Sequence, residues 1–261
     1  DVERSRGLGD VYKRQLSKAH REPTRSDFEN NINIQPEELI DYELGWKYNA
    51  EKFFFNSNLY YMGYKNQLVL TGALDDVGSP IRENSGKSYR TGIELESVYK
   101  ATNKLNISAN ISLSENKNVD YKTNYNGVIT DWGDTDISFS PNVISSAGIQ
   151  FSASQDLTFT LLNKFVGNQY MSNTESNISR LSSYSTTDLN ILYTIKNSAY
   201  FSEIIVTAMI NNIFNKEYVS NGYYYTYDDT WSDPNLITTI EGTGYYPQAK
   251  RNFLLGLTFK L

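Results

Sequence analysis

Apolar and polar residues alternate with a period of two along much of the chain from Leu39 onward. The run YELGWKYN at 42–49 is one clear case, LNISANISLS at 105–114 is a second, and FLLGLTFKL at 253–261 is a third. A period of two places successive side chains on opposite faces of a β-strand. No helical period of comparable length competes with it, so the pattern predicts an all-β fold.

The alternating stretches predict about nine full strands, and a tenth, truncated one that ends near His20. Most are about 10–14 residues long, whereas strands of globular proteins usually have about 5–6 residues. A tilted strand that crosses a bilayer needs about 9–11 residues. The predicted strands are 39–49, 53–66, 88–100, 105–116, 142–153, 157–168, 184–195, 203–213 and 251–261.

The connections between these strands alternate strictly between short and long. Outer-membrane barrels have short periplasmic turns and long extracellular loops, whereas a soluble sandwich has no reason to put every long loop at one end. The chain is therefore predicted to be one domain of an antiparallel transmembrane β-barrel. Short turns lie near 50–52, 101–104, 154–156 and 196–203, and long polar loops lie at 67–87, 117–141, 169–183 and 214–250.

Composition narrows the function classes. The chain has no cysteine, a single histidine (His20) and a net charge of −6. These counts exclude thiolate metal sites and most histidine-based catalytic sites, and they argue against nucleic acid as a partner. We therefore expect no enzyme active site, no bound metal and no cofactor. The 21 tyrosines suit a protein whose aromatic rings lie at membrane–water interfaces.

Residues 1–15 are interpreted as foreign to the protein. The run SRGLGDVYKRQ at 5–15 equals one translated reading frame of a common transposase-based sequencing adapter. Such segments are excluded from arguments about the fold. The natural domain is then expected to cover 16–261 and to be a fragment of a longer protein.

Five short motifs then carry a family resemblance across 16–261. In chain order and spacing, they resemble the C-terminal half of TonB-dependent outer-membrane receptors, especially those of Bacteroides-type bacteria. The motifs are AHREPTR at 19–25, QPE with YELG within 35–45, RTGIEL at 90–95, NIFNKEY at 212–218 and YPQAKRNF at 246–253.

The resemblance implies about the last ten strands of a 22-stranded barrel, without its plug domain. It implies TonB-dependent active uptake of a large nutrient across the Gram-negative outer membrane, with a ferric siderophore or a vitamin-like chelate as the favoured substrate. The implied partners are the TonB–ExbB–ExbD complex (acting through the missing plug), the barrel assembly machinery, outer-membrane lipid and the transported small-molecule ligand. Gly256, Phe259 and Leu261 fit the family's barrel-assembly signal, although Leu255 and the non-aromatic last residue depart from it.

Several side chains are candidates for a functional role, and each also has a purely structural interpretation. Tyrosine and tryptophan in one long loop predict a ligand-binding patch, with an aromatic girdle as the alternative. Three charged residues of one strand are expected to face the lumen, as part of the transport path or simply of the wall. The patch comprises Tyr223, Tyr224, Tyr225, Tyr227 and Trp231, and the lumen-facing residues are Arg90, Glu94 and Glu96.

The remaining candidates are acidic loop residues and the single histidine. Oxygen clusters can bind Ca²⁺, but without a calcium-loop spacing a solvated surface is the favoured reading of Asp75, Asp76, Asp131, Asp134 and Asp136. His20 is read as a loop or girdle residue rather than a haem or metal ligand.

Two other functions stay open from the sequence. The first is a small passive outer-membrane pore or adhesin of about ten strands. The second is a secreted carbohydrate-binding β-sandwich that uses its tyrosines. The sequence does not name the transported substrate.

Overall fold

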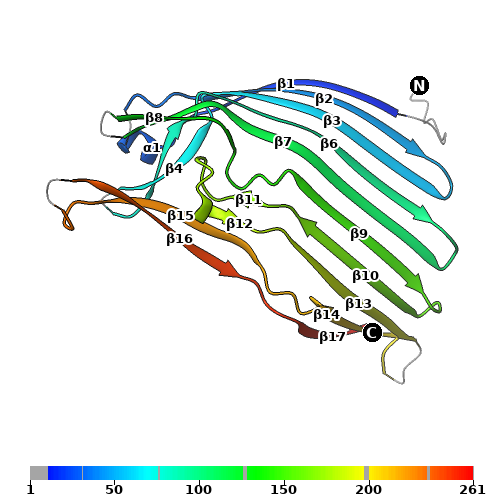
Figure 1. Cartoon of the computed structure of the whole chain (residues 1–261). Coiled ribbons are helices and arrows are strands. Elements are labelled where there is room, and N and C mark those ends of the chain that lie inside the picture. The colour runs from blue at the N-terminus through cyan, green and yellow to red at the C-terminus, as the bar shows by residue number, and fades with distance from the viewer. Residues whose placement is uncertain are drawn as a thin grey trace.

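Ten long strands make the wall of the molecule. The computed structural model describes residues 11–30, 32–75, 77–125, 128–196, 200–233 and 236–260. Each wall strand pairs antiparallel with the next in chain order, and together they form one curved sheet (Figure 1). The wall strands are β1 (Val11–Arg21), β2 (Glu37–Asn49), β3 (Phe53–Lys65), β6 (Lys87–Lys100), β7 (Leu105–Tyr125), β9 (Val143–Ser152), β10 (Leu157–Val166), β13 (Tyr184–Lys196), β14 (Glu203–Asn211) and β17 (Asn252–Lys260).

The predicted all-β antiparallel fold and its strands are confirmed. One continuous wall does not fit a β-sandwich, in which two sheets stack face to face. The two end strands, β1 and β17, do not pair with each other anywhere in the described ranges, so the sheet is not closed into a barrel. The total of 22 strands stays a prediction.

The four predicted long loops contain secondary structure that the sequence pattern did not predict. Short strands and one short helix fill them, and a second short helix, at Arg25–Asn30, lies between β1 and β2. Figure 1 shows these elements at the end of the wall where β1 ends and β2 begins. Four of the strands form a small sheet in the order β16-β15-β4-β5, and β8 pairs with the extension of β7. The elements are α1 (Arg25–Asn30), β4 (Leu68–Leu74), β5 (Pro80–Asn84), β8 (Val128–Asp136), β11 (Gln169–Tyr170), η1 (Asn177–Ser179), β12 (Arg180–Leu181), β15 (Val219–Asp229) and β16 (Thr238–Pro247).

The wall has one apolar face and one polar face, because successive residues of each strand point to opposite sides. Leu44, Leu59, Ile93 and Leu113 lie directly opposite one another on four consecutive strands. One position along, Gly45, Asn58, Glu94 and Ser112 form the matching row on the other face. Leu44 and Leu59 are each 48% exposed, so no protein covers the apolar row. The apolar outer face is the one that lipid would cover.

The buried core lies among the loops and not along the wall. We call the following long-loop elements the loop cluster: β4, β5, β7 beyond Asn116, β8, the β8–β9 connection, residues 167–183, β15 and β16. Nearly all buried apolar side chains in the described ranges lie in the loop cluster or at the ends of the wall strands next to it. These buried side chains are Ile34, Leu68, Val69, Tyr121, Ile137, Val166, Met171 and Leu181.

Asn173 joins three parts of the loop cluster. It is 2% exposed, its Nδ2 donates to Leu70 O at 3.0 Å, and its Oδ1 accepts from Ser138 N at 3.0 Å. Asn173→Ala is expected to destabilise the cluster by about 1–3 kcal/mol, because it removes the hydrogen bonds of both partly buried backbone groups. Hydrogen exchange at 68–74 and 135–139 measures this. The exposed wall residue Asn106, replaced by Ala, is the control, and equal protection in both variants would contradict the role of Asn173.

Residues 11–15 pair with β2 as part of β1. Arg14 lies directly opposite Leu44 and so interrupts the apolar face. An arginine on the lipid side of a barrel costs about 2–4 kcal/mol near the bilayer midplane. This position suits a residue that was not selected for contact with lipid. The foreign origin of residues 1–15 stays a prediction, and residues 1–10 lie outside the described ranges.

Candidate functional site

The inner face of the wall carries the three charged residues that were expected in the lumen. The side chains of Arg90, Glu94 and Glu96 lie on the polar face, on alternate positions of β6. Arg90 Nη1 donates to Ser140 Oγ at 2.7 Å, which holds the β8–β9 connection against this face. Arg90 and Glu94 border one hollow of about 320 Å³, and Glu96 lies outside it. A role of these charges in transport stays a prediction.

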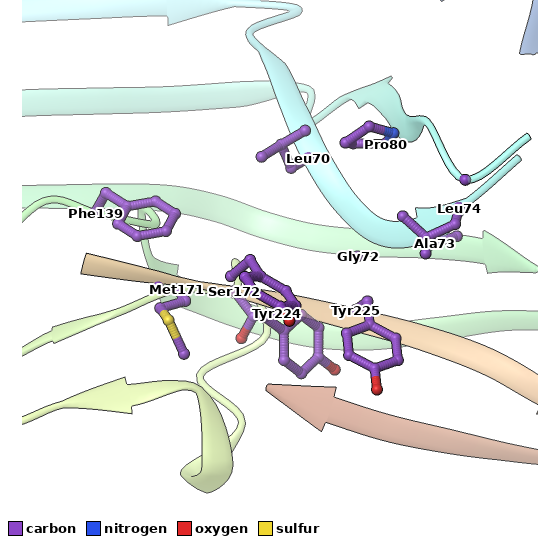
Figure 2. A pocket seen from close by; sticks show the side chains of 13 residues that line it. Leu70, Gly72, Ala73, Leu74, Pro80, Phe139, Met171, Ser172, Tyr224 and Tyr225 are labelled. Carbon is purple, nitrogen blue, oxygen red and sulfur yellow. The ribbon is translucent and has the colours of Figure 1, made fainter. Parts of the chain in front are cut away.

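A larger cavity of about 480 Å³ lies within the loop cluster. Its walls come from β4, the β8–β9 connection, residues 171–172 and β15, which are far apart in the sequence (Figure 2). None of the described residues that line it carries a charged side chain. The lining residues are Leu70, Gly72, Ala73, Leu74, Gly78, Pro80, Phe139, Met171, Ser172, Gly222, Tyr223, Tyr224 and Tyr225. Such a cavity, mostly apolar with a few hydroxyl groups, suits a small organic ligand or part of one.

The predicted aromatic patch divides between the two faces of β15. Tyr223, Tyr225 and Tyr227 stack along one face, with ring centroids 6.1 and 6.4 Å apart. Tyr223 and Tyr225 cover Gly244 and Gly242 on β16, where an added Cβ would come within 2.3 Å of each ring. A side chain at either glycine would therefore displace the ring that covers it.

Only part of the predicted patch borders the cavity. Tyr223, Tyr224 and Tyr225 line it, whereas Tyr227 and Trp231 do not. Trp231 follows the end of β15 and is 80% exposed. The use of any of these residues in ligand binding stays a prediction.

Tyr224 connects the β15–β16 hairpin to β4. Its ring packs against Gly72, which has a φ of +91° and no room for a Cβ, since Cε1 of the ring would be 2.6 Å away. Its Oη donates to Glu241 Oε1 at 2.6 Å. Burial and this carboxylate raise the pKa of Tyr224 above its ordinary value, so the hydroxyl stays a donor at physiological pH.

A second tyrosine–carboxylate pair lies in the interior of the loop cluster. Tyr121 is 1% exposed, and its Oη donates to Glu83 Oε1 at 3.0 Å. Burial raises the pKa of Tyr121 and also that of Glu83, although the hydrogen bond from Tyr121 partly offsets the shift of Glu83. This pair links the β7–β8 and β4–β5 hairpins, and the packing of Tyr224 against Gly72 links the β15–β16 hairpin to β4.

Glu83 is expected to make the loop cluster pH-dependent. From the ordinary carboxyl pKa of 4.5 up to the raised pKa of folded Glu83, the folded state holds the proton more tightly than the unfolded state. The contribution of Glu83 to stability therefore falls as pH rises through that window. Glu83→Gln keeps an acceptor for Tyr121 and is expected to abolish the fall. Amide protection of β5 and β7 at pH 4 and pH 8 tests this, and a fall that persists in the variant would contradict it.

The acidic loop residues make separate contacts. Lys122 pairs with Asp131 at 3.0 Å, Lys117 pairs with Asp136 at 2.6 Å, and Asp134 accepts from the backbone N of Asp120 at 3.0 Å. Asp75 accepts from backbone groups of its own turn, and Asp76 lies outside the described residues. Within the described ranges, no three acidic or histidine side chains gather into a metal site.

His20 and the barrel-assembly signal lie on the wall. His20 is exposed and lies directly opposite Glu38. Gly256 lies opposite Thr207 on the inner face and Phe259 opposite Ile204 on the outer face, while Leu261 lies outside the described residues. Recognition of this segment by the assembly machinery stays a prediction.

Comparisons with known proteins bear on the same regions. Residues 6–213 match the family model described as "TonB dependent receptor-like, beta-barrel". No curated protein sequence matches the chain.

Solved structures resemble the wall and its loops. The siderophore receptor PiuA from Acinetobacter baumannii is 19% identical, with a TM-score of 0.64 over 87% of this chain and 29% of its own. The copper transporter OprC is 17% identical, with a TM-score of 0.69 over 97% of this chain and 37% of its own. The ferric yersiniabactin uptake receptor FyuA from Yersinia pestis is 16% identical, with a TM-score of 0.64 over 95% of this chain and 34% of its own. The chain thus spans about a third of the length of the solved structures it matches.

Proposed function

The chain belongs to the TonB-dependent receptor-like β-barrel family, and on this premise we propose that it serves the active uptake of a metal chelate across the outer membrane. Members of the family are transport receptors of the outer membrane and not enzymes. The observation that carries the proposal is the cavity of the loop cluster, whose described lining has no charged side chain. It lies at the same end of the wall as the hollow beside Arg90.

The choice of a metal chelate rests on two features. The similar solved structures include a siderophore receptor, a copper transporter and a ferric yersiniabactin receptor. The cavity offers tyrosine hydroxyls and apolar surface, which suit the organic shell of a chelate. A ferric siderophore is the favoured substrate, and a vitamin-like chelate is the second choice.

The proposed transport needs partners outside this chain. The TonB–ExbB–ExbD complex would draw energy from the inner membrane and act through a plug domain. Outer-membrane lipid would cover the apolar face, and the barrel assembly machinery would insert the strands.

Within the described ranges, no helix is long and apolar enough to cross a membrane.

Uptake measurements in whole cells test the proposal. We expect cells without the gene for the complete receptor to lose uptake of at least one radiolabelled ferric siderophore, and cells without TonB to lose the same uptake. Radiolabelled cobalamin, measured in parallel, tests the vitamin-like alternative. Uptake that needs the receptor but persists without TonB would contradict the proposal and favour the passive pore.

Filling the cavity is expected to block ligand binding. Ala73→Trp places an indole between β4 and β15, and we expect the affinity for the transported chelate to fall by about tenfold or more. Ala73→Ser, which leaves the volume nearly unchanged, is the matched control. Equilibrium binding to the purified complete receptor measures both, and equal affinities would exclude this cavity as the binding site.

A further inference from the structure

Three lysines line up on the outer face of the wall at its loop end. Lys65 on β3 lies directly opposite Lys87 on β6, and Glu38 on β2 lies directly opposite Lys65. Lys18 on β1 reaches the same carboxylate, with its Nζ 3.6 Å from Glu38 Oε2. Lys18, Lys65 and Lys87 are called here the lysine patch.

The lysine patch has more positive charge than its neighbours balance. Lys65 Nζ lies 3.8 Å from Glu38 Oε1, so two lysines share one carboxylate at long distances. Lys87 makes no ion pair with any residue in the described ranges. Like charges directly opposite each other destabilise a pair of strands. The facing ammonium groups of Lys65 and Lys87 therefore favour an anion beside them.

The aromatic residues next to the patch give its depth in the membrane. Tyr61 and Tyr89 lie on the same outer face but closer to the middle of the wall, four residues from Lys65 and two residues from Lys87. Their rings stack with centroids 6.2 Å apart. Tyr42 lies beside Tyr61 at 6.5 Å. Tyrosines of this kind mark the boundary between hydrocarbon and headgroups. The lysine patch therefore lies at the level of the headgroups on the side of the long loops.

We propose that the lysine patch binds the phosphorylated headgroup of a lipid in the outer leaflet. The proposal rests on the proposed outer-membrane placement of the chain. Lysine binds phosphate as a mobile point charge, and clusters of basic residues beside a membrane attract anionic headgroups. The tyrosines below the patch would lie along the upper part of the acyl chains. The lipid would bridge β1, β2, β3 and β6 from outside.

Lipid binding to the purified complete receptor tests the proposal. Nanodiscs of phosphatidylcholine carry either lipid A or its dephosphorylated form, and native mass spectrometry counts the lipid that stays bound. We expect the double variant K65Q/K87Q to bind lipid A about 25-fold more weakly, since each surface lysine contributes roughly a fivefold factor. We expect K65R/K87R to bind as the unchanged receptor does.

The control uses two lysines at the other end of the wall, Lys52 just before β3 and Lys100 at the end of β6. Lys52 and Lys100 are exposed and adjacent, with the Lys100 N–H donating to Lys52 O at 2.8 Å. K52Q/K100Q is expected to keep full lipid A binding. The proposal is overturned if K65Q/K87Q binds lipid A normally or if dephosphorylated lipid binds equally well. The assay contains no chelate and no TonB, so its result is independent of the uptake test.

Discussion

Leu59→Arg is expected to destabilise the complete receptor by about 2–4 kcal/mol in lipid vesicles. Leu59 lies in the middle of the outer face, in a row with Leu44, Ile93 and Leu113, and 48% of it is exposed. An arginine there would place its charge in hydrocarbon, directly between the apolar side chains of Leu44 and Ile93. Denaturant unfolding of the receptor in vesicles measures the loss.

Asn58→Arg is the matched control. Asn58 precedes Leu59 on β3 but faces the polar side, directly opposite Gly45 and Glu94. Its replacement by arginine is expected to change the free energy of unfolding by less than about 1 kcal/mol, because the new charge lies beside carboxylates and water. If both variants lost stability equally, the assignment of the two faces would be wrong.

This chain expressed by itself is expected to accumulate in inclusion bodies. The edge strands β1 and β17 each present a row of backbone groups with no partner strand in the described ranges. Open edges are not tolerated in lipid and act as templates for aggregation in water. The uncovered apolar face adds a second adhesive surface.

The complete receptor, expressed and extracted under the same conditions, is the control and is expected to reach the membrane fraction. Size-exclusion chromatography and circular dichroism of detergent extracts distinguish the two outcomes. A monodisperse, folded species of this chain alone would show that its edges are protected by some other means.

The wall could be predicted because each of its strands has one apolar and one polar face. The strand predicted at 88–100 corresponds to β6 at Lys87–Lys100, and the strand predicted at 184–195 corresponds to β13 at Tyr184–Lys196. The hairpins within the long loops were missed. In β15, three consecutive tyrosines at 223–225 interrupt any alternation, and the opposite strand supplies glycines where side chains would be expected.

The candidate site could be predicted only in part. Clustered aromatic residues indicated β15, and three of them border the cavity. Tyr121 and Glu83 were missed because their hydrogen bond joins residues 38 positions apart, and neither residue stands out locally. Phe139 and Met171 were missed for the same reason. The cavity exists only once four separate loops are brought together.

The bare apolar face also bears on how such a chain changes over time. A protein interior selects side chains by shape, because each must fit its neighbours at high density. A fluid lipid surface adapts to any outline and demands only that the side chain be apolar. Leucine, isoleucine, valine and phenylalanine are therefore nearly interchangeable along this face, and mutations accumulate there without loss of the architecture. Sequence identities of 15–19% at TM-scores of up to 0.69 are what this freedom would produce.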